Sequence, residues 1–275
     1  MVVQDNGEQY MNKTIFNKFD KHRISELPRI LFPGRIVTIL SEGEAERAVD
    51  YLLSKSILGF DTETRPVFTK GRQNKVALLQ VSTHDCCFLF RLNRIGLCPA
   101  VVRLLEAEGP LKIGLSWHDD LNALHKRGEF EPRGFIDLQD HMKELGIEDL
   151  SLAKLYANIF GQRISKREQL SNWEADVLSV KQQEYGATDA WACIRLYEEY
   201  LRLKETKDYT LEIVPEPELP LPVNPAPDDN TEVKANPRRA RSANRKAVAK
   251  EAPRKKRVYK RKTAQEKVST KESIR

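Results

Sequence analysis

Residues 35–207 carry apolar segments in an order that restricts the fold more than any other feature of the chain. β-branched or continuous apolar segments bounded by turn residues are typical of strands. Such segments occur as RIVTIL, SILGFDTET, KVALLQVST, CCFLF, LKIGLS and FID. The short polar turn THD joins the third and fourth and predicts a hairpin, and helical segments separate most of the others. This order predicts an α/β domain with a mixed sheet covered by helices rather than a uniform βαβ repeat.

The helices are predicted from apolar residues that recur three or four positions apart. In SEGEAERAVDYLL, Ser41 is a candidate N-cap, and Ala45, Ala48 and Leu52 form one apolar face. Further helices are expected over residues 99–108, 117–128, 138–146, 150–161, 171–179 and 181–204. Strands and helices together place the C-terminal boundary of the ordered domain near residue 207.

The segments on either side of this domain differ from it in composition. Residues 1–34 show no clear periodicity and are expected to form an irregular arm that packs on the domain through residues 30–32. Residues 208–233 are rich in proline and acidic residues, which predicts an extended linker. Residues 234–275 contain 17 Lys or Arg and 3 Glu with few large apolar groups, which predicts a disordered basic tail.

The net charge of +6 is the sum of two opposite contributions, because the tail carries +14 and residues 1–233 carry −8. Basic residues interleaved with Ala, Pro and Ser suit non-specific contact with nucleic-acid phosphates. The stretch PRKKRVYKRK also fits a nuclear-localisation signal. A solubilising extension without a further role is the remaining alternative.

The chain has no apolar stretch of the roughly 18–20 residues that cross a bilayer. Its N-terminus has neither the apolar core of a signal peptide nor the character of a transit peptide. We therefore expect an intracellular location, cytoplasmic or, in a eukaryote, nuclear. Cys86, Cys87, Cys98 and Cys193 form no C-x-x-C pair, so reduced thiols and no zinc site are expected.

Two carboxylates, Asp61 and Glu63, follow the apolar run SILGF directly. Side chains two apart in a strand point to the same face, so the two carboxylates would lie together and Thr62 would face the other way. Unpaired, they repel, which raises one pKa. A divalent cation such as Mg²⁺ removes this repulsion and favours oxygen ligands. On this pair alone, a metal site and a solvated strand end are both open.

Two further acidic spots carry weaker signals. Asp119 and Asp120 follow the strand LKIGL in the first turn of a helix, where acids often only complement the helix dipole. Tyr185 and Asp189 lie one turn apart on the helix over 181–204, among apolar residues. A buried Asp needs a partner, and the tyrosine could be that partner for structural reasons alone.

The order of these motifs, D-x-E, then D, then Y-x-x-x-D, resembles the DEDDy class of 3′–5′ exonucleases, which includes ribonuclease D and the Werner syndrome exonuclease domain. GFDTETRPVFTKGRQNKVALLQVST resembles the first motif region of the Werner-type enzymes, and KIGLSWHDDLNAL resembles the second. The segment from SLAKLYANIFG to YGATDAWACIRLYEEY resembles the region leading into the third. The resemblance covers residues 36–204 and implies a ribonuclease H-like fold, an α/β mixed sheet flanked by helices.

The resemblance also implies a site with two divalent metal ions, Mg²⁺ or Mn²⁺. The metal-binding acids would be Asp61, Glu63, Asp120 and Asp189, and Tyr185 would orient the attacking water. Asp120 is preferred over the preceding aspartate because it fits the family's pattern of an acid followed by apolar residues. The enzyme would release nucleoside 5′-monophosphates from nucleic-acid 3′ ends, with DNA slightly favoured over RNA.

Substrate contacts are expected from residues near the same strand end, because stacking and phosphate contacts hold single strands. The candidates are Thr62, Arg65, Lys75, Trp117 and His118, although tryptophans in such places more often pack in the core. Two alternatives to a DNA exonuclease remain. One is ribonuclease D-like processing of RNA 3′ ends, and the other is a non-catalytic nucleic-acid-binding or scaffold protein on the same fold.

Overall fold

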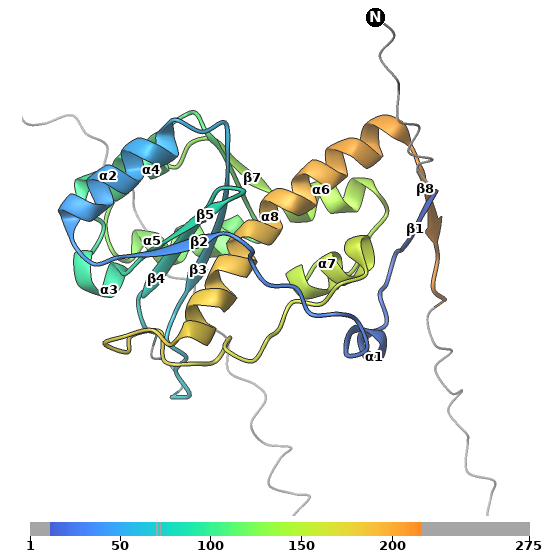
Figure 1. Cartoon of the computed structure of the whole chain (residues 1–275), viewed down its shortest axis with the longest axis horizontal. Coiled ribbons are helices and arrows are strands. Elements are labelled where there is room, and N and C mark those ends of the chain that lie inside the picture. Colours follow the sequence, from blue (N-terminus) through green and yellow to red (C-terminus); the bar gives the residue numbers. More distant parts are fainter. Residues whose placement is uncertain (1–11, 70, 72, 216–275) are drawn as a thin grey trace, which may run out of the picture. The chain divides into compact units, whose positions relative to one another are not determined.

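The computed structural model describes residues 12–69, 71 and 73–215, and the predicted basic tail lies outside these residues. Its centre is a six-stranded sheet with the strand order β2-β5-β4-β3-β6-β7 (Figure 1). β4 runs antiparallel to both β3 and β5, and the other neighbouring strands are parallel, which confirms the predicted mixed sheet. The strands are β2 (Arg35–Ile39), β3 (Ile57–Glu63), β4 (Leu78–Ser82), β5 (Cys86–Phe90), β6 (Leu111–Gly114) and β7 (Phe135–Asp137).

Helices cover both faces of this sheet, as predicted. On one face, Leu58 and Phe60 of β3 pack in a core with α2, α4 and α5. On the other face, the long helix α8 crosses the sheet, and its apolar residues form a second core (Figure 1). The helices of the domain are α2 (Glu42–Leu53), α3 (Leu92–Ile95), α4 (Pro99–Glu106), α5 (Trp117–His125), α6 (Leu138–Glu144), α7 (Leu152–Phe160) and α8 (Val180–Thr206).

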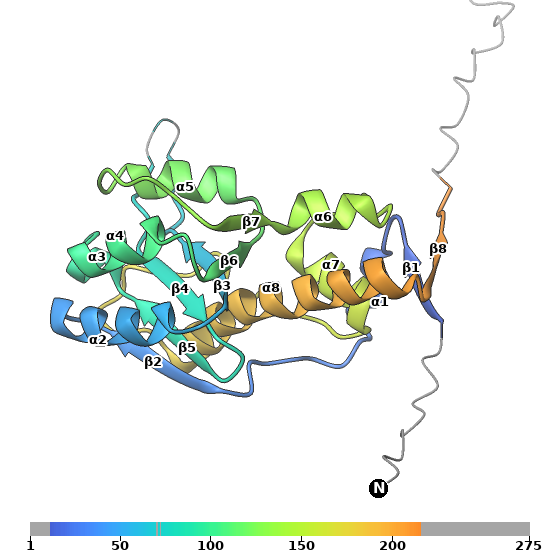
Figure 2. The same cartoon turned by 90° about the horizontal axis from the view of Figure 1, so that it is seen from above.

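Capping residues in the sequence set where α2 and α8 begin. The Ser41 hydroxyl accepts a hydrogen bond from the backbone N–H of Glu44, and the Glu44 carboxylate accepts one from the backbone N–H of Ser41. The predicted N-cap is therefore confirmed. Ser179 and Gln182 form the same reciprocal box at the start of α8. α8 then runs for 27 residues and extends past the sheet, where α6 and α7 lie beside it (Figure 2).

The prediction of a helix over residues 171–179 is wrong, because this segment consists of turns. The Asn172 side chain accepts a hydrogen bond from the backbone N–H of Glu174 at 3.2 Å. The Ser171 hydroxyl accepts one from the side chain of Gln182 at 2.9 Å. Short polar side chains that bond nearby backbone compete with helix formation. Trp173, in the same segment, is fully buried and anchors these turns against the domain.

The arm before the domain contains regular structure that the sequence did not reveal. β1 (Lys13–Phe16) pairs in parallel with β8 (Tyr209–Glu212), and the short helix α1 (Lys21–Ile24) follows β1. The expected packing through residues 30–32 is confirmed, since Phe32 is buried with its ring 5.9 Å from that of Trp191. Among the helices that the structure describes, none combines the length and the apolar character needed to cross a membrane.

Candidate active site

Three carboxylates meet where the end of β3 faces α8. Asp61 and Glu63 belong to the last residues of β3, and Asp189 belongs to the buried part of α8. One carboxylate oxygen from each residue lies within 4.8 Å of the other two. The strand period therefore brings Asp61 and Glu63 to one face, and α8 adds the third acid from far along the chain.

Gly59 allows α8 to approach β3 this closely. It lies two residues before Asp61, on the same face of the strand. A Cβ atom placed on Gly59 would lie 1.9 Å from the carbonyl oxygen of Ala190, the residue after Asp189. Any side chain here would therefore push the α8 backbone away from the carboxylates of β3. Gly59 was not among the predicted site residues. An isolated glycine within a strand often marks the close approach of another backbone, and this feature could have identified it.

The cluster is largely shielded from water, and this burial raises the pKa of each of its three carboxylates. Burial raises the pKa of Glu63 to about 9, and the charges of Asp189 and Asp120 add to this effect. Burial also raises the pKa of Asp189 to about 7, against the lowering effect of a hydrogen bond from Tyr185. The pKa of Asp61 lies well above its usual range because of burial and the neighbouring carboxylates. A cation among these groups would reverse this effect.

The donor set of the cluster fits a divalent cation. Oδ1 of Asp189 is buried and has no hydrogen-bond partner among the described residues. Burying such an oxygen without a partner costs free energy, and a bound cation would remove that cost. Carboxylate oxygens are also the ligands that Mg²⁺ and Mn²⁺ prefer. Asp61, Glu63 and Asp189 can therefore hold the metal that the sequence resemblance implies.

Asp120 approaches the same strand end from α5. β6 pairs with β3 only as far as Gly59, so the later residues of β3 are open toward the start of α5. Oγ1 of Thr62 donates a hydrogen bond to Oδ1 of Asp120 at 2.5 Å. Burial raises the pKa of Asp120 to about 6, and the bond from Thr62 opposes that shift. Asp119, by contrast, is exposed.

Thr62 lines the pocket and also contacts Asp120. Its side chain does leave β3 on the side away from Asp61 and Glu63, but it does not point away from the site as a whole. It holds Asp120, whose charge in turn raises the pKa of Asp61. The sequence missed this contact because it joins residues on two separate elements.

Tyr185 lies one helical turn before Asp189 and is buried in α8. Its hydroxyl donates the hydrogen bond that lowers the pKa of Asp189. Burial and the nearby carboxylates raise the pKa of Tyr185 far above its usual range. The hydroxyl therefore stays protonated at neutral pH and can donate a hydrogen bond but cannot act as a base.

The carboxylates open into a pocket of about 550 Å³. Its walls come from the end of β3, the start of α7, the segment after α7 and the buried part of α8. Lys166 is the one basic side chain of this lining, and its charge lowers the pKa of Asp189. It was not among the residues predicted for the site. The pocket therefore places an acidic cluster at the end of a hollow large enough for a small organic group.

A match to a known protein family identifies the class of protein that carries this fold and this acidic cluster. The family model described as 3′-5′ exonuclease matches residues 36–204, which is more than half of the chain. The chain belongs to the 3′–5′ exonuclease family. Members of this class are hydrolases of phosphodiester bonds, and the acidic cluster of this exonuclease domain is the expected kind of metal-binding site.

The exonuclease domain is similar to parts of longer proteins. The bifunctional 3′-5′ exonuclease/ATP-dependent helicase WRN of Mus musculus is 29% identical over 194 residues, which is 66% of this chain and 14% of that protein. The exonuclease 3′-5′ domain-containing protein 2 of Drosophila melanogaster is 32% identical over 157 residues, which is 56% of this chain and 27% of that protein. The chain thus corresponds to well under half the length of these two relatives.

A solved structure confirms the fold of the exonuclease domain. Trypanosoma brucei ribonuclease D in complex with RNA U12 superposes with a TM-score of 0.54 at 18% identity, over 62% of this chain and 63% of that one. The ribonuclease H-like arrangement that the resemblance implied, a mixed sheet flanked by helices, is therefore confirmed.

Other expected substrate contacts lie outside the lining of this pocket. Trp117 is buried, with its ring centroid 4.6 Å from that of Phe135, and packs in the core beside β7. Arg65 is exposed, and its guanidinium lies 3.4 Å from the carboxylate of Glu174. His118 and Lys75 are exposed as well. Of the five candidates, only Thr62 belongs to the pocket wall.

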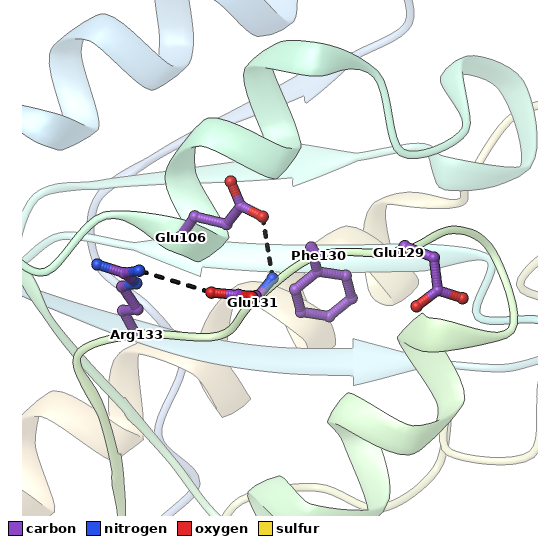
Figure 3. Close-up of a pocket in the computed structure, with 5 residues that line it drawn as sticks. All are labelled: Glu106, Glu129, Phe130, Glu131 and Arg133. Carbon is purple, nitrogen blue, oxygen red and sulfur yellow. Dashed lines mark hydrogen bonds and ion pairs between the residues drawn. The ribbon is translucent and has the colours of Figure 1, made fainter. Parts of the chain in front are cut away.

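A second hollow, of about 690 Å³, lies beside the end of α4 and is not part of the exonuclease site (Figure 3). Its acids largely bond the chain itself: Glu106 accepts a hydrogen bond from the backbone of Glu131 at 2.9 Å, and Arg133 lies 3.5 Å from the Glu131 carboxylate. An acidic lining of this kind repels nucleic-acid phosphates. The residues that line it are Glu106, Glu129, Phe130, Glu131 and Arg133.

Proposed function

We propose that the chain is a metal-dependent 3′–5′ exonuclease that releases nucleoside 5′-monophosphates from nucleic-acid 3′ ends. The observation that carries this proposal is the cluster of Asp61, Glu63 and Asp189 at the pocket. Membership of the family supports the phosphodiester as the bond that is hydrolysed. All four acids and the tyrosine of the DEDDy pattern are present, which argues against a non-catalytic scaffold on the same fold.

Two divalent cations, Mg²⁺ or Mn²⁺, complete the proposed centre. Asp61, Glu63 and Asp189 would hold one ion, and Asp61 with Asp120 would hold the other. When bound, the ions would lower the pKa of the attacking water and offset the charge that develops on the leaving 3′ oxygen. Without cations the carboxylates repel a phosphate, so the chain's own residues bind substrate at this pocket only when the ions are present.

Tyr185 is proposed to orient the attacking water. α8 holds its hydroxyl beside Asp189, and the ring of Trp173 packs against it with centroids 5.9 Å apart. Because the pKa of Tyr185 is raised, the hydroxyl keeps its proton and positions the water through a hydrogen bond. Positioning of this kind lowers the entropy lost on reaching the transition state.

The preference for DNA or RNA as the substrate is inferred only from the similarity of this chain to other exonucleases. The resemblance of residues 59–83 to the first motif of the Werner-type enzymes supports DNA, which we favour. A ribonuclease D-like activity on RNA 3′ ends is supported by the RNA in the Trypanosoma brucei structure.

We also propose that the basic tail, residues 234–275, contacts phosphates of long strands. Its charge of +14 against −8 for the rest of the chain supports this role. Truncation after residue 215 retains β8 and its pairing with β1, so all the described elements are kept. The truncated protein should lose affinity for long strands at low salt, and unchanged affinity would remove the tail from the proposal.

The proposal is tested with matched DNA and RNA strands carrying a label at the 5′ end. Incubation with Mg²⁺ or Mn²⁺ should shorten the labelled strand one nucleotide at a time and release unlabelled 5′-monophosphates. Release of a labelled mononucleotide first would mean the opposite polarity. Intact strands with either metal would favour the scaffold alternative, and faster loss of the RNA strand would favour ribonuclease D-like processing.

A further inference from the structure

The N-terminal arm lies outside the residues that the family model matches, yet it is fastened beside the exonuclease pocket. The backbone N–H of Arg163 donates to the carbonyl of Pro28 at 2.9 Å, and the N–H of Ile30 donates to the carbonyl of Arg163 at 3.1 Å. The N–H of Phe32 donates to the hydroxyl of Thr188 at 3.0 Å, next to Asp189. These bonds hold the arm against the segment after α7 and against α8.

The arm and this segment enclose a groove of about 480 Å³, which we name the arm groove. Ala153, Ile164 and Lys166 line both the arm groove and the acidic pocket, so the two hollows are adjacent. α1 lies beside α7 at this place (Figure 1). The residues that line the arm groove are Lys21, Ile24, Ser25, Ala153, Lys154, Arg163, Ile164, Ser165, Lys166 and Arg167.

The arm groove is basic, in contrast to the acidic pocket that it joins. Its lining has five Lys or Arg side chains and no Asp or Glu. Lys154 is paired with Asp149 at 2.7 Å. Among the residues that the structure describes, no carboxylate forms an ion pair with Lys21, Lys166 or Arg167 within 4.0 Å. These three side chains are exposed, so their charges are available to an anionic ligand.

We propose that the arm groove binds the phosphates of the substrate strand on the 5′ side of the bond that is cut. This inference rests on the proposed function, which puts the 3′ end of the strand in the acidic pocket. A strand whose 3′ end lies in that pocket must continue along a neighbouring surface, and the arm groove is a basic surface directly beside the pocket. The apolar side chains of Ile24 and Ile164 offer contacts to sugars and bases. The arm thus supplies substrate affinity that a cluster of carboxylates cannot supply.

Two matched double variants test this inference. Lys21→Ala/Arg167→Ala removes two charges of the arm groove without touching the acidic pocket. Arg47→Ala/Arg103→Ala removes two charges from α2 and α4, which cover the opposite face of the sheet. Circular dichroism and thermal melting show whether each variant is folded.

Binding is measured by fluorescence anisotropy with a labelled single strand of about 12 nucleotides. Both doubles are placed in an Asp189→Asn background with Mg²⁺, so that the strand stays intact. Each phosphate contact to a single strand contributes about 0.7 to the salt dependence of log K, so the arm-groove double should lower this slope by about 1.4. The same arithmetic gives about 25-fold weaker binding at about 0.1 M salt, with little change for the α2/α4 double.

Equal affinities of the two folded double variants for the labelled strand would overturn the inference. Hydrolysis in the otherwise unchanged chain separates this failure from failure of the proposed function. If the unchanged chain cuts the strand but the arm-groove double binds as tightly as the control, only the arm groove is wrong. If the unchanged chain releases no mononucleotide and binding still depends on Lys21 and Arg167, the proposed function fails and the arm groove stands.

Discussion

Gly59 of β3 lies directly against the backbone of Ala190 in α8, so close that a Cβ at residue 59 would sit 1.9 Å from the Ala190 carbonyl oxygen. This contact fixes the distance between the strand that carries Asp61 and Glu63 and the helix that carries Asp189. The geometry of the acidic cluster therefore depends on a residue that has no side chain.

The substitution Gly59→Ala should destabilise the protein by about 1–3 kcal/mol or more, because the added methyl group cannot fit without moving α8. The same movement would separate Asp189 from Asp61, so affinity for Mn²⁺ should fall as well. Urea unfolding and calorimetric titration with Mn²⁺ measure the two effects. Gly43→Ala, at an exposed position of α2, is the matched control, since the nearest atom to the added Cβ would be 3.8 Å away. It should stabilise the protein by about 0.5–1 kcal/mol. A Gly59→Ala protein as stable as the parent would contradict the packing account.

The melting temperature of the metal-free protein should fall as the pH rises through the range set by the cluster. Folding raises the pKa of Asp120 to about 6, of Asp189 to about 7 and of Glu63 to about 9. A carboxyl whose pKa is higher folded than unfolded (about 4) stabilises the fold fully below the unfolded value, and that stabilisation is lost as pH rises through the folded pKa. Thermal melts between about pH 5 and pH 9, with and without Mg²⁺, measure how the melting temperature depends on pH. The fall should be smaller with Mg²⁺ and smaller in Glu63→Gln, whereas a melting temperature that rises with pH would contradict the sign.

The substitution Thr62→Val should weaken the binding of a second Mn²⁺ by about tenfold or more, because side chains that position a metal ligand commonly contribute that much. It removes the hydroxyl that donates to Asp120 and keeps the size of the side chain. The stoichiometry and affinity from Mn²⁺ titration provide the readout. Thr62→Ser keeps the donor and should bind nearly as the parent does. If both variants bind alike, Thr62 does not position Asp120.

The substitution Tyr185→Phe should lower kcat by about 100-fold while leaving Mn²⁺ affinity nearly unchanged, because the hydroxyl positions water and holds no metal. Steady-state kinetics on a short single strand, together with Mn²⁺ titration, separate the two quantities. Tyr197→Phe, on the same helix and partly exposed, is the control and should behave as the parent does. An equal loss of kcat in both variants would show that the effect is structural.

Local periodicity predicted the two halves of the site separately. The period of a strand put Asp61 and Glu63 on one face, and the period of a helix put Tyr185 and Asp189 on one face, and both are confirmed. Their meeting was implied only by the resemblance to known exonucleases, because no local pattern specifies which strand a helix crosses. Gly59 sets the distance at which α8 crosses β3, but an isolated glycine in a strand does not indicate which element approaches it.

Contacts between distant elements account for what the sequence did not predict. The hydrogen bond between Thr62 and Asp120 joins β3 to α5 where the edge of β3 is unpaired. The pairing of β1 with β8 joins segments near the two ends of the described residues. Strands of four residues are too short to show a reliable alternation. The prediction of a helix over residues 171–179 failed because bonds between side chains and the backbone of this segment stabilise turns in place of the helix that its apolar spacing indicated.

The most direct test of the metal-centre account is the rate of 5′-monophosphate release in Mg²⁺ by three aspartate-to-asparagine variants. Asp189→Asn and Asp120→Asn each remove one charge from the proposed metal ligands, and Asp119→Asn removes one charge from the exposed neighbour of Asp120. The account predicts that the first two variants fold but release no measurable product and that Asp119→Asn retains activity close to the parent. Normal turnover by folded Asp189→Asn would contradict it.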